Sequence, residues 1–324
     1  MSLLRLSGWR VTGSAGERAF VVAMGGTPHA DRLRCLGRHL ERTAQAATCA
    51  CTRSSCAAVN YSPPEPRSID DLRTPCLVLQ LDVAKRNIER MQARAEKLGC
   101  VVRPHVKTHK TLELGALQTQ GTRRRIAVST LAEAEFFAAG GFDDILYAVP
   151  ITPDKLPEAA ALTVALDSFH ILVDNMIQLE AIFSRPPPSA LKPWSVWIMV
   201  DCGYHRDGVD PTDPVSVEIA RRLCESPTTT FAGIYTHGGH SYDADGTGAP
   251  VRPNAVVEAG EAERDVTVNF KRLLEKRGIH CPTVGVGSTP TCSSPPAHLD
   301  GVHEMHPVRT LSRDRGQACV MAAS

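Results

Sequence analysis

Arg103-Pro104-His105-Val106-Lys107-Thr108-His109-Lys110 follows an apolar run, Cys100-Val101-Val102, and therefore stands where a buried strand is expected to end. In barrels of parallel strands, the reacting groups lie at the carboxyl ends of the strands. A lysine whose surroundings lower its pKa can form a Schiff base with a carbonyl compound. Lys107 is the candidate for that role. The alternative is that Lys107 and Lys110 are solvated charges on a loop.

A second strand exit, Val284-Gly285-Val286-Gly287-Ser288-Thr289-Pro290-Thr291, contains two glycines followed by hydroxyl side chains. Free backbone amides in such a turn can hold a phosphate group. Gly287, Ser288 and Thr289 are its candidate contacts. The alternative is that Gly285 and Gly287 are glycines needed for barrel packing, with a polar turn after them.

Two more apolar runs end in polar loops. Residues 195–200 lead into Asp201-Cys202-Gly203-Tyr204-His205-Arg206-Asp207-Gly208, where Arg206 either faces a cofactor or pairs with a neighbouring aspartate. Residues 231–234 lead into Tyr235-Thr236-His237-Gly238-Gly239-His240-Ser241-Tyr242. No cysteine stands at zinc-ligand spacing beside those histidines, so a zinc site there is not predicted.

Together, PHVKTHKT, VDCGYHRDGV, YTHGGHSY and VGVGSTPT resemble the motifs of the D-serine dehydratase and D-threonine aldolase family of alanine-racemase-like (fold-type III) pyridoxal-phosphate enzymes. They occur in family order between residues 70 and 307. The resemblance implies that Lys107 forms the Schiff base with pyridoxal 5'-phosphate and that Ser288 and Thr289 lie at its phosphate. The remaining cofactor contacts that it implies are Arg206, Tyr235, His237, Tyr242 and Gly287.

The resemblance also implies an activity: a lyase that converts D-serine to pyruvate and ammonia, with D-threo-3-hydroxyaspartate or D-threonine as further substrates. A retro-aldol enzyme acting on D-threonine-type substrates and a catalytically silent pyridoxal-phosphate-binding protein are the alternatives. The expected partner is a small D-amino acid, and a homodimer is usual in the family.

The fold implied is a (β/α)8 TIM-like barrel of the alanine racemase N-terminal domain type, spanning residues 67–307. Strands are predicted at residues 74–81, 100–106, 126–129, 144–149, 170–173, 195–200, 230–235, 282–286 and 301–305. That is one strand more than a closed barrel accepts. In the resembling family, the first strand leaves the barrel and joins a carboxy-terminal β domain.

The two ends of the chain depart from the family. Residues 1–66 hold eight arginines, no lysine and four acidic residues, and are expected to be an unstructured or targeting-like extension. Residues 308–324 form a short divergent tail in place of the β domain, which in relatives holds zinc through a histidine and a cysteine two positions apart. No His-x-Cys pair occurs in this sequence, so no metal ligand is assigned. We therefore expect the first strand to lack its partners, and this form to bind the cofactor but eliminate water slowly.

The composition excludes several other classes of protein. A net charge of +1 without a long basic block argues against nucleic acid and acidic membrane surfaces as partners. No apolar run reaches the length of a membrane span. Eleven cysteines, an odd number without a secretory signal, favour a reduced cytoplasmic protein, with mitochondrial targeting as the alternative. Cys49, Cys51 and Cys56 are interpreted as incidental, because no second ligand pair follows at zinc spacing.

Overall fold

The computed structural model describes residues 7–12, 18–23, 76–242, 254–308 and 320–322 of the 324-residue chain. Contacts between residues divide the chain into two compact units, one of residues 1–83 with 318–324 and one of residues 84–317. The larger unit carries the predicted barrel and is described first.

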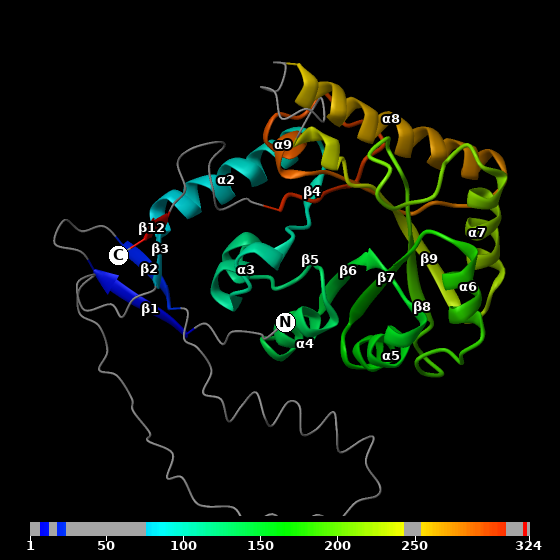
Figure 1. Ribbon diagram of the computed structural model, residues 1–324, viewed down its shortest axis with the longest axis horizontal. Coiled ribbons are helices and arrows are strands. Elements are labelled where there is room, and N and C mark those ends of the chain that lie inside the picture. The colour runs from blue at the N-terminus through cyan, green and yellow to red at the C-terminus, as the bar shows by residue number, and fades with distance from the viewer. Residues whose placement is uncertain (1–6, 13–17, 24–75, 243–253, 309–319, 323–324) are drawn as a thin grey trace, which may run out of the picture. The chain divides into compact units, whose positions relative to one another are not determined.

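Eight strands of this unit form one parallel sheet, with helices on its outside (Figure 1). Their order is β4-β11-β10-β9-β8-β7-β6-β5. The edge strands meet because His105 forms a parallel bridge with Ala127, whose N–H donates to the Pro104 carbonyl at 2.9 Å. This contact closes the sheet and confirms the predicted (β/α)8 barrel. The strands are β4 (Val101–Val102), β5 (Ile126–Val128), β6 (Asp144–Pro150), β7 (Ser168–Val173), β8 (Trp194–Met199), β9 (Thr229–Tyr235), β10 (Val284–Val286) and β11 (Glu304–Met305).

Both faces of these strands are buried, which explains their nearly continuous apolar sequences. In β8, Val196 and Ile198 join the large outer core beneath the helices. Trp197 and Met199 point the other way, into a small apolar cluster inside the barrel. The short strand β4 continues as an extended segment, since the N–H of Arg103 donates to Met305 O at 2.9 Å.

Helices alternate with the barrel strands, and the first turns of some of them are capped by side chains. Thr130 accepts a hydrogen bond from the N–H of Glu133 at the start of one helix, and Asn175 caps another in the same way. In the helix at residues 81–97, Ala84, Ile88 and Met91 recur at helical spacing and are all buried. The helices are α2 (Leu81–Lys97), α3 (Leu112–Gln118), α4 (Leu131–Ala139), α5 (Leu156–Ala165), α6 (Met176–Phe183), α7 (Pro214–Glu225), α8 (Ala255–Lys276) and α9 (Thr289–Ser293).

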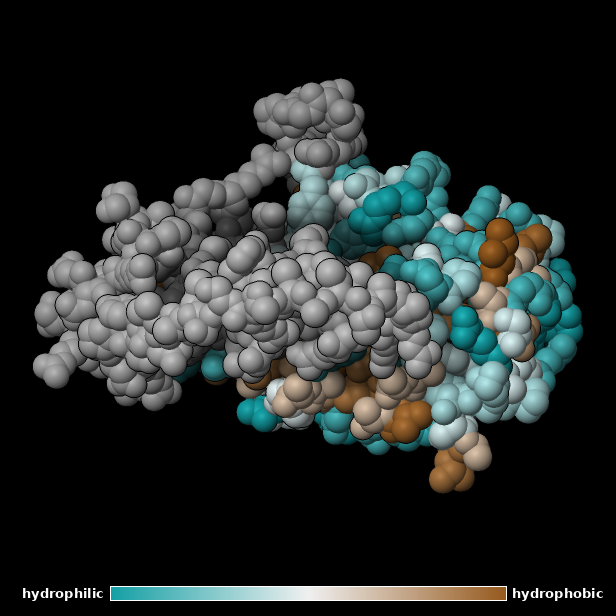
Figure 2. Space-filling view, turned by 60° about the horizontal axis from the view of Figure 1, so that its bottom comes forward, coloured by the Kyte–Doolittle hydropathy of each residue, from teal (hydrophilic) through white to brown (hydrophobic). Residues whose placement is uncertain are grey.

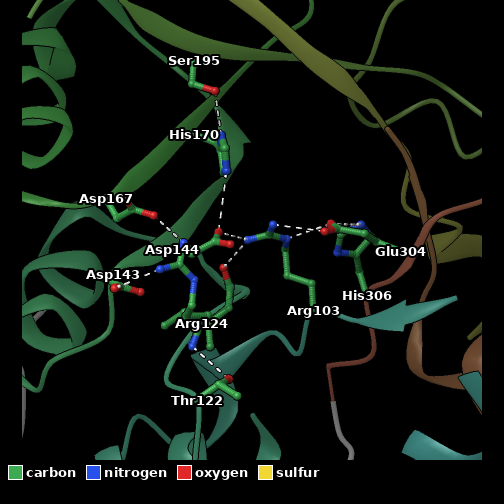
Figure 3. A network of polar contacts seen from close by, with 11 residues as sticks. Arg103, Thr122, Arg124, Asp143, Asp144, Asp167, His170, Ser195, Glu304 and His306 are labelled. Atoms are coloured by element: carbon green, nitrogen blue, oxygen red, sulfur yellow. Dashed lines mark hydrogen bonds and ion pairs between the residues drawn. The ribbon is translucent and has the colours of Figure 1, made fainter. Parts of the chain in front are cut away.

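A buried polar layer crosses the interior of the barrel (Figure 3). The guanidinium of Arg103, which is 3% exposed, bonds through Nη1 to Asp144 Oδ1 at 2.7 Å and through Nε to Glu304 Oε2 at 2.8 Å. The network continues to His170, whose Nε2 lies 3.6 Å from Asp144 Oδ1 and whose Nδ1 contacts Ser195 Oγ at 2.7 Å. Side chains from β6, β7, β8 and β11 are thereby tied to the segment that follows β4.

The charge balance of this layer makes it sensitive to acid. Burial alone would raise the pKa of Asp144, but hydrogen bonds from His170 and Arg103 and the charge of Arg103 lower it on balance. For Glu304, burial likewise raises the pKa, but the charge and the hydrogen bond of Arg103, with a smaller effect of His306, lower it on balance. Because both pKa values lie below those of the unfolded chain, the stabilisation is complete above the unfolded values. It is lost as the pH falls through the folded ones.

Hydrophilic side chains cover much of the surface visible in Figure 2, with smaller hydrophobic groups between them. The most exposed large apolar side chains include Leu191 and Ile177, at 92% and 76%. None of the described helices is both long enough and apolar enough to cross a membrane. Five cysteines of the described part are free thiols: Cys100, Cys202, Cys224, Cys281 and Cys292.

The smaller unit contains a four-stranded antiparallel sheet in the order β1-β2-β3-β12. Its strands are β1 (Ser7–Thr12), β2 (Arg18–Ala23), β3 (Cys76–Gln80) and β12 (Val320–Ala322). As the resemblance implies, the first predicted strand, now β3, lies outside the barrel sheet.

The expectation that the first strand lacks its partners was wrong. Residues 7–12 and 18–23 are strands and not an unstructured extension, and residues 320–322 of the tail also form a strand. As a result, β3 is paired on both sides, by β2 and by β12, and does not lack partners. Residues 1–6, 13–17, 24–66, 309–319 and 323–324 lie outside the described residues.

Replacing Arg103 by methionine leaves Asp144 and Glu304 as buried carboxylates without a counter-charge. We expect Arg103→Met to lower the free energy of unfolding by about 3–5 kcal/mol, measured by urea denaturation. Removing all three charges together, as Arg103→Met with Asp144→Leu and Glu304→Leu, should cost much less, because no charge then stays buried alone.

Arg124→Met is the matched control for that series. Arg124 is 41% exposed and pairs with Asp143 and Asp167 at the surface. Its loss should change the free energy of unfolding by less than about 1 kcal/mol. Similar losses in Arg103→Met and Arg124→Met would contradict a structural role for the buried layer.

Candidate active site

The predicted site residues all follow carboxyl ends of barrel strands. Lys107 lies in the 3-10 turn η2 (Val106–Thr108) after β4, and Arg206 lies in the loop after β8. Tyr235 ends β9, and the Gly287–Thr289 turn follows β10. Tyr242 follows the 3-10 turn η4 (Gly239–Ser241). Because the strands are parallel, these residues gather at one end of the barrel.

Lys107 and Lys110 have different surroundings. The ammonium of Lys110 pairs with Glu133 Oε1 at 2.9 Å, and the buried Glu133 also accepts the N–H of Ser129 through Oε2 at 2.8 Å. Within the described part of the chain, the Lys107 side chain has no ion pair. Burial lowers the pKa of Lys107, and the charge of Arg206 lowers it further. Lys107 is therefore the lysine whose amine is available for chemistry.

His105 holds the backbone at Lys107. Its Nδ1 accepts the N–H of Lys107 at 3.3 Å, and its Nε2 contacts Ser129 Oγ at 3.1 Å. Burial, followed by the charge of Lys107, keeps the pKa of His105 well below its ordinary value. Smaller effects of the same sign come from His237 and His306, so these side chains from β4, β9 and β11 lie within electrostatic range of one another.

The turn after β10 is held by its own hydroxyl groups. Thr291 Oγ1 accepts the N–H of Ser288 at 2.9 Å, and Ser288 Oγ accepts the N–H of Thr291 at 3.3 Å. Tyr242 Oη accepts the N–H of Thr289 at 3.2 Å. The sequence interpretation of free amides in this turn was therefore wrong: these N–H groups bond to hydroxyls within and beside it.

Glycine is required at the start of this turn. Gly287 has φ +139°, and a Cβ there would lie 2.6 Å from Cys292 Sγ. The carbonyl of Gly287 accepts a hydrogen bond from His237 Nδ1 at 3.0 Å, which leaves His237 Nε2 as the acceptor nitrogen. Thr289 Oγ1 accepts the N–H of Val308 at 3.1 Å, so the turn is also tied to the chain after β11.

Tyr235 is buried at the end of β9, and burial raises the pKa of its hydroxyl. That hydroxyl makes no hydrogen bond to any residue that the structure describes. Its ring packs on His306, with ring centroids 4.4 Å apart. Tyr235 therefore keeps a neutral hydroxyl that is free to bond a group bound in the barrel mouth.

Arg206 pairs with a neighbouring aspartate, which is the second of the two arrangements considered from the sequence. Its guanidinium pairs with Asp207 at 3.1 Å and lies 5.4 Å from the ring of Tyr204. The side chain is 48% exposed. Its charge nevertheless reaches the site, because it lowers the pKa of both Lys107 and His237 after the larger effect of burial.

Two buried residues of this region were not predicted. Neither ring nitrogen of His306 has a well-formed hydrogen bond within the described residues, and its Nε2 is 4.0 Å from Glu304 Oε2. Burial lowers the pKa of His306 to about 3, so its ring is neutral. Glu263 of α8 is 1% exposed and accepts the N–H of Gly238 at 2.6 Å. Two sequence features could have indicated them. His306 directly follows a strand, and Glu263 is an acidic residue on the apolar face of a helix.

No cluster of three or more metal-ligating side chains occurs among the described residues. The arrangement instead combines an unpaired amine with hydroxyl groups and a neutral histidine, at the mouth of a barrel. Such a set can bind a carbonyl compound covalently and hold a polar or anionic group beside it.

The comparisons with known proteins agree with this geometry. Residues 79–303 match the family described as alanine racemase, N-terminal domain. That match covers more than half of the chain, and the chain therefore belongs to this family.

Among characterised relatives, the chain is 38% identical over 253 residues to a D-serine dehydratase from Dictyostelium discoideum, covering 74% of this chain and 62% of the relative. It is 40% identical over 237 residues to a D-threo-3-hydroxyaspartate dehydratase from Delftia sp. (strain HT23), covering 72% and 60%. A solved structure of the Delftia enzyme superposes with a TM-score of 0.68 at 38% identity, covering 75% and 62%. The chain thus spans about three fifths of the length of these relatives.

We expect acetylation at neutral pH, followed by peptide mass mapping, to label Lys107 faster than Lys110. A lowered pKa leaves a larger neutral fraction of the Lys107 amine, whereas the Lys110 side chain is engaged in an ion pair with Glu133. Glu133→Gln should mainly raise the labelling of Lys110. Faster labelling of Lys110 than of Lys107 in the wild-type chain would contradict the assignment.

Proposed function

We propose that this barrel binds pyridoxal 5'-phosphate through Lys107 and acts as a lyase that eliminates water from D-serine. The observation that carries the proposal is the unpaired, half-buried amine of Lys107, which shares the barrel mouth with the Gly287–Thr289 turn. The similarity to dehydratases of D-serine and D-threo-3-hydroxyaspartate supports the same reaction.

The residues present fit a phosphate-bearing aldehyde. Lys107 supplies an amine for a Schiff base. Ser288, Thr289 and Tyr242 supply hydroxyls beside a glycine whose side-chain position is filled by Cys292. The N–H groups of the turn would exchange their hydroxyl partners for phosphate oxygens. When bound, the cofactor supplies an electron sink for the carbanion that forms when the α proton leaves.

Lys107 has two roles in this scheme. It would hold the aldehyde, and its amine, when free, would take the α proton of the substrate. A pKa below the ordinary lysine value favours the neutral amine that this step needs. Tyr235 and His237 would orient the bound ring through their available hydroxyl and Nε2. Arg206 would bind an anionic group only by exchanging Asp207 for it.

The overall reaction is balanced without an oxidant. D-Serine loses its α proton and its β hydroxyl as water, and water then adds to release pyruvate and ammonium. A β hydroxyl is a poor leaving group, and a Lewis acid lowers that barrier. A solved structure similar to this chain is described as a cysteine-to-alanine mutant of a D-threo-3-hydroxyaspartate dehydratase in the metal-free form. We assign no metal ligand to the present chain, because its sequence contains no His-x-Cys pair.

A retro-aldol reaction is the second candidate. The chain is 32% identical over 185 residues to a 3-hydroxy-D-aspartate aldolase from Paracoccus denitrificans. Such an enzyme would cleave the Cα–Cβ bond and yield glycine and an aldehyde in place of a keto acid. The products therefore separate the two reactions.

The test is to incubate the 324-residue protein with pyridoxal phosphate and D-serine, with and without added zinc, and to measure pyruvate. We expect pyruvate from D-serine and none from L-serine. Lys107→Ala should lower kcat/KM by about a thousandfold or more, because it removes both the point of attachment and the base.

Lys110→Ala is the matched control, since that ammonium is paired with Glu133. It should retain most of the activity. Glycine and an aldehyde from D-threonine, without pyruvate from D-serine, would favour the aldolase. Cofactor binding without either product would favour a catalytically silent binding protein.

A further inference from the structure

Glu263 lies in α8, outside the set of residues that contact the proposed cofactor. Its side chain is 1% exposed, and its Oε1 accepts the N–H of Gly238 at 2.6 Å. A Cβ on Gly238 would lie 2.3 Å from that oxygen, so the backbone approaches the carboxylate as closely as only glycine allows. Gly238 directly follows His237, and the carboxylate therefore fixes the backbone beside that histidine.

The same carboxylate reaches the turn after β10. Burial raises the pKa of this carboxylate, and hydrogen bonding by the Thr291 side chain lowers it to a smaller extent. Thr291 Oγ1 also accepts the N–H of Ser288 at 2.9 Å. Ser288 Oγ in turn contacts Ser241 Oγ at 2.6 Å. Glu263 thus connects two segments, the loop after β9 and the turn after β10.

No positive charge balances this buried carboxylate among the described residues. Its hydrogen-bond donors are a backbone N–H and a hydroxyl, and burial raises the pKa of Glu263 to about 7. A buried carboxyl without a cation costs stability. Such costs are retained where a group serves function, and perturbed carboxyls concentrate at functional sites.

We propose that Glu263 is a positioning residue that holds the loop after β9 and the turn after β10 in the arrangement that binds pyridoxal phosphate. The proposal rests on the proposed function. It explains why both segments meet a single buried carboxylate and why His237 Nδ1 is aligned on Gly287 O at 3.0 Å. Glu263 itself touches neither the cofactor nor the substrate in this scheme.

Glu263 is the group in this part of the site whose protonation changes near neutral pH, because the groups that face it do not ionise there. Cys202, Tyr235 and Cys292 interact with it electrostatically, and burial raises the pKa of each, so all three stay neutral there. The other contacts are the Gly238 N–H and the Thr291 hydroxyl, which do not ionise in this range. Affinity for the cofactor should therefore fall as the pH drops below about 7.

The contribution of Glu263 to folding stability changes with pH in the direction opposite to its effect on cofactor affinity. A pKa raised above the unfolded value means that the contribution of Glu263 to stability is present at acid pH and is lost as the pH rises through the folded pKa. At mildly alkaline pH, Glu263→Gln should therefore match or exceed the wild type in melting temperature. A purely structural role would instead make this variant less stable.

The experiment titrates wild-type chain and Glu263→Gln with pyridoxal phosphate and follows visible absorbance across pH. We expect the apparent Kd to rise about tenfold or more at mildly alkaline pH, the effect typical of losing a hydrogen bond to a charged group. The fall in affinity at acid pH should also disappear in the variant. Glu261→Gln is the matched control, because Glu261 is exposed on the same helix; it should leave both Kd and pH dependence unchanged.

Thr291→Val provides a second variant in case Glu263→Gln does not fold, and it should weaken binding in the same sense. Unchanged affinity and pH dependence in a folded Glu263→Gln chain would overturn the positioning role while leaving the proposed function intact. Failure of the wild-type chain to bind pyridoxal phosphate at all would instead reject the proposed function.

Discussion

The ion pairs of Arg103 with Asp144 and Glu304 are the constraint on which the candidate site depends. Arg103 precedes His105 by two residues and Lys107 by four, so fixing its guanidinium fixes where the chain after β4 delivers the lysine. Glu304 likewise precedes His306, which packs on Tyr235. A guanidinium that is 3% exposed needs both carboxylates to offset its desolvation. The polar layer in Figure 3 therefore stabilises the barrel and also the segments that lead to Lys107 and His306.

Charge is distributed around Lys107 in a way that leaves its amine reactive. Burial keeps His105 and His306 neutral, so neither adds a positive charge beside it. Glu133 is paired with Lys110. Burial lowers the pKa of Lys107, and the charge of Arg206 lowers it further. Arg206 itself pairs with Asp207. The proposal that Lys107 is the reactive lysine therefore rests on the partners of its neighbours and not on its position in the peptide alone.

Local patterns predicted the barrel strands and the polar segments that follow their carboxyl ends, because apolar runs ending in polar motifs are a property of each segment by itself. Local patterns did not predict contacts between segments that lie far apart in the sequence. The partners of β3 come from residues 18–23 and 320–322, which no local pattern connects to it. The roles of Glu263 and His306 depend on what α8 and β11 pack against. The amides of the Ser288 turn were misjudged because hydroxyls of Thr291 and Tyr242 reach them only in the folded chain.

The central claim is that Lys107 carries pyridoxal phosphate at the mouth of this barrel. The most direct measurement is borohydride reduction of the protein incubated with pyridoxal phosphate, followed by peptide mass mapping. The account predicts one pyridoxyl group, on Lys107, which disappears in Lys107→Ala and persists in Lys110→Ala. A pyridoxyl group on Lys110, or none on any lysine, would contradict it.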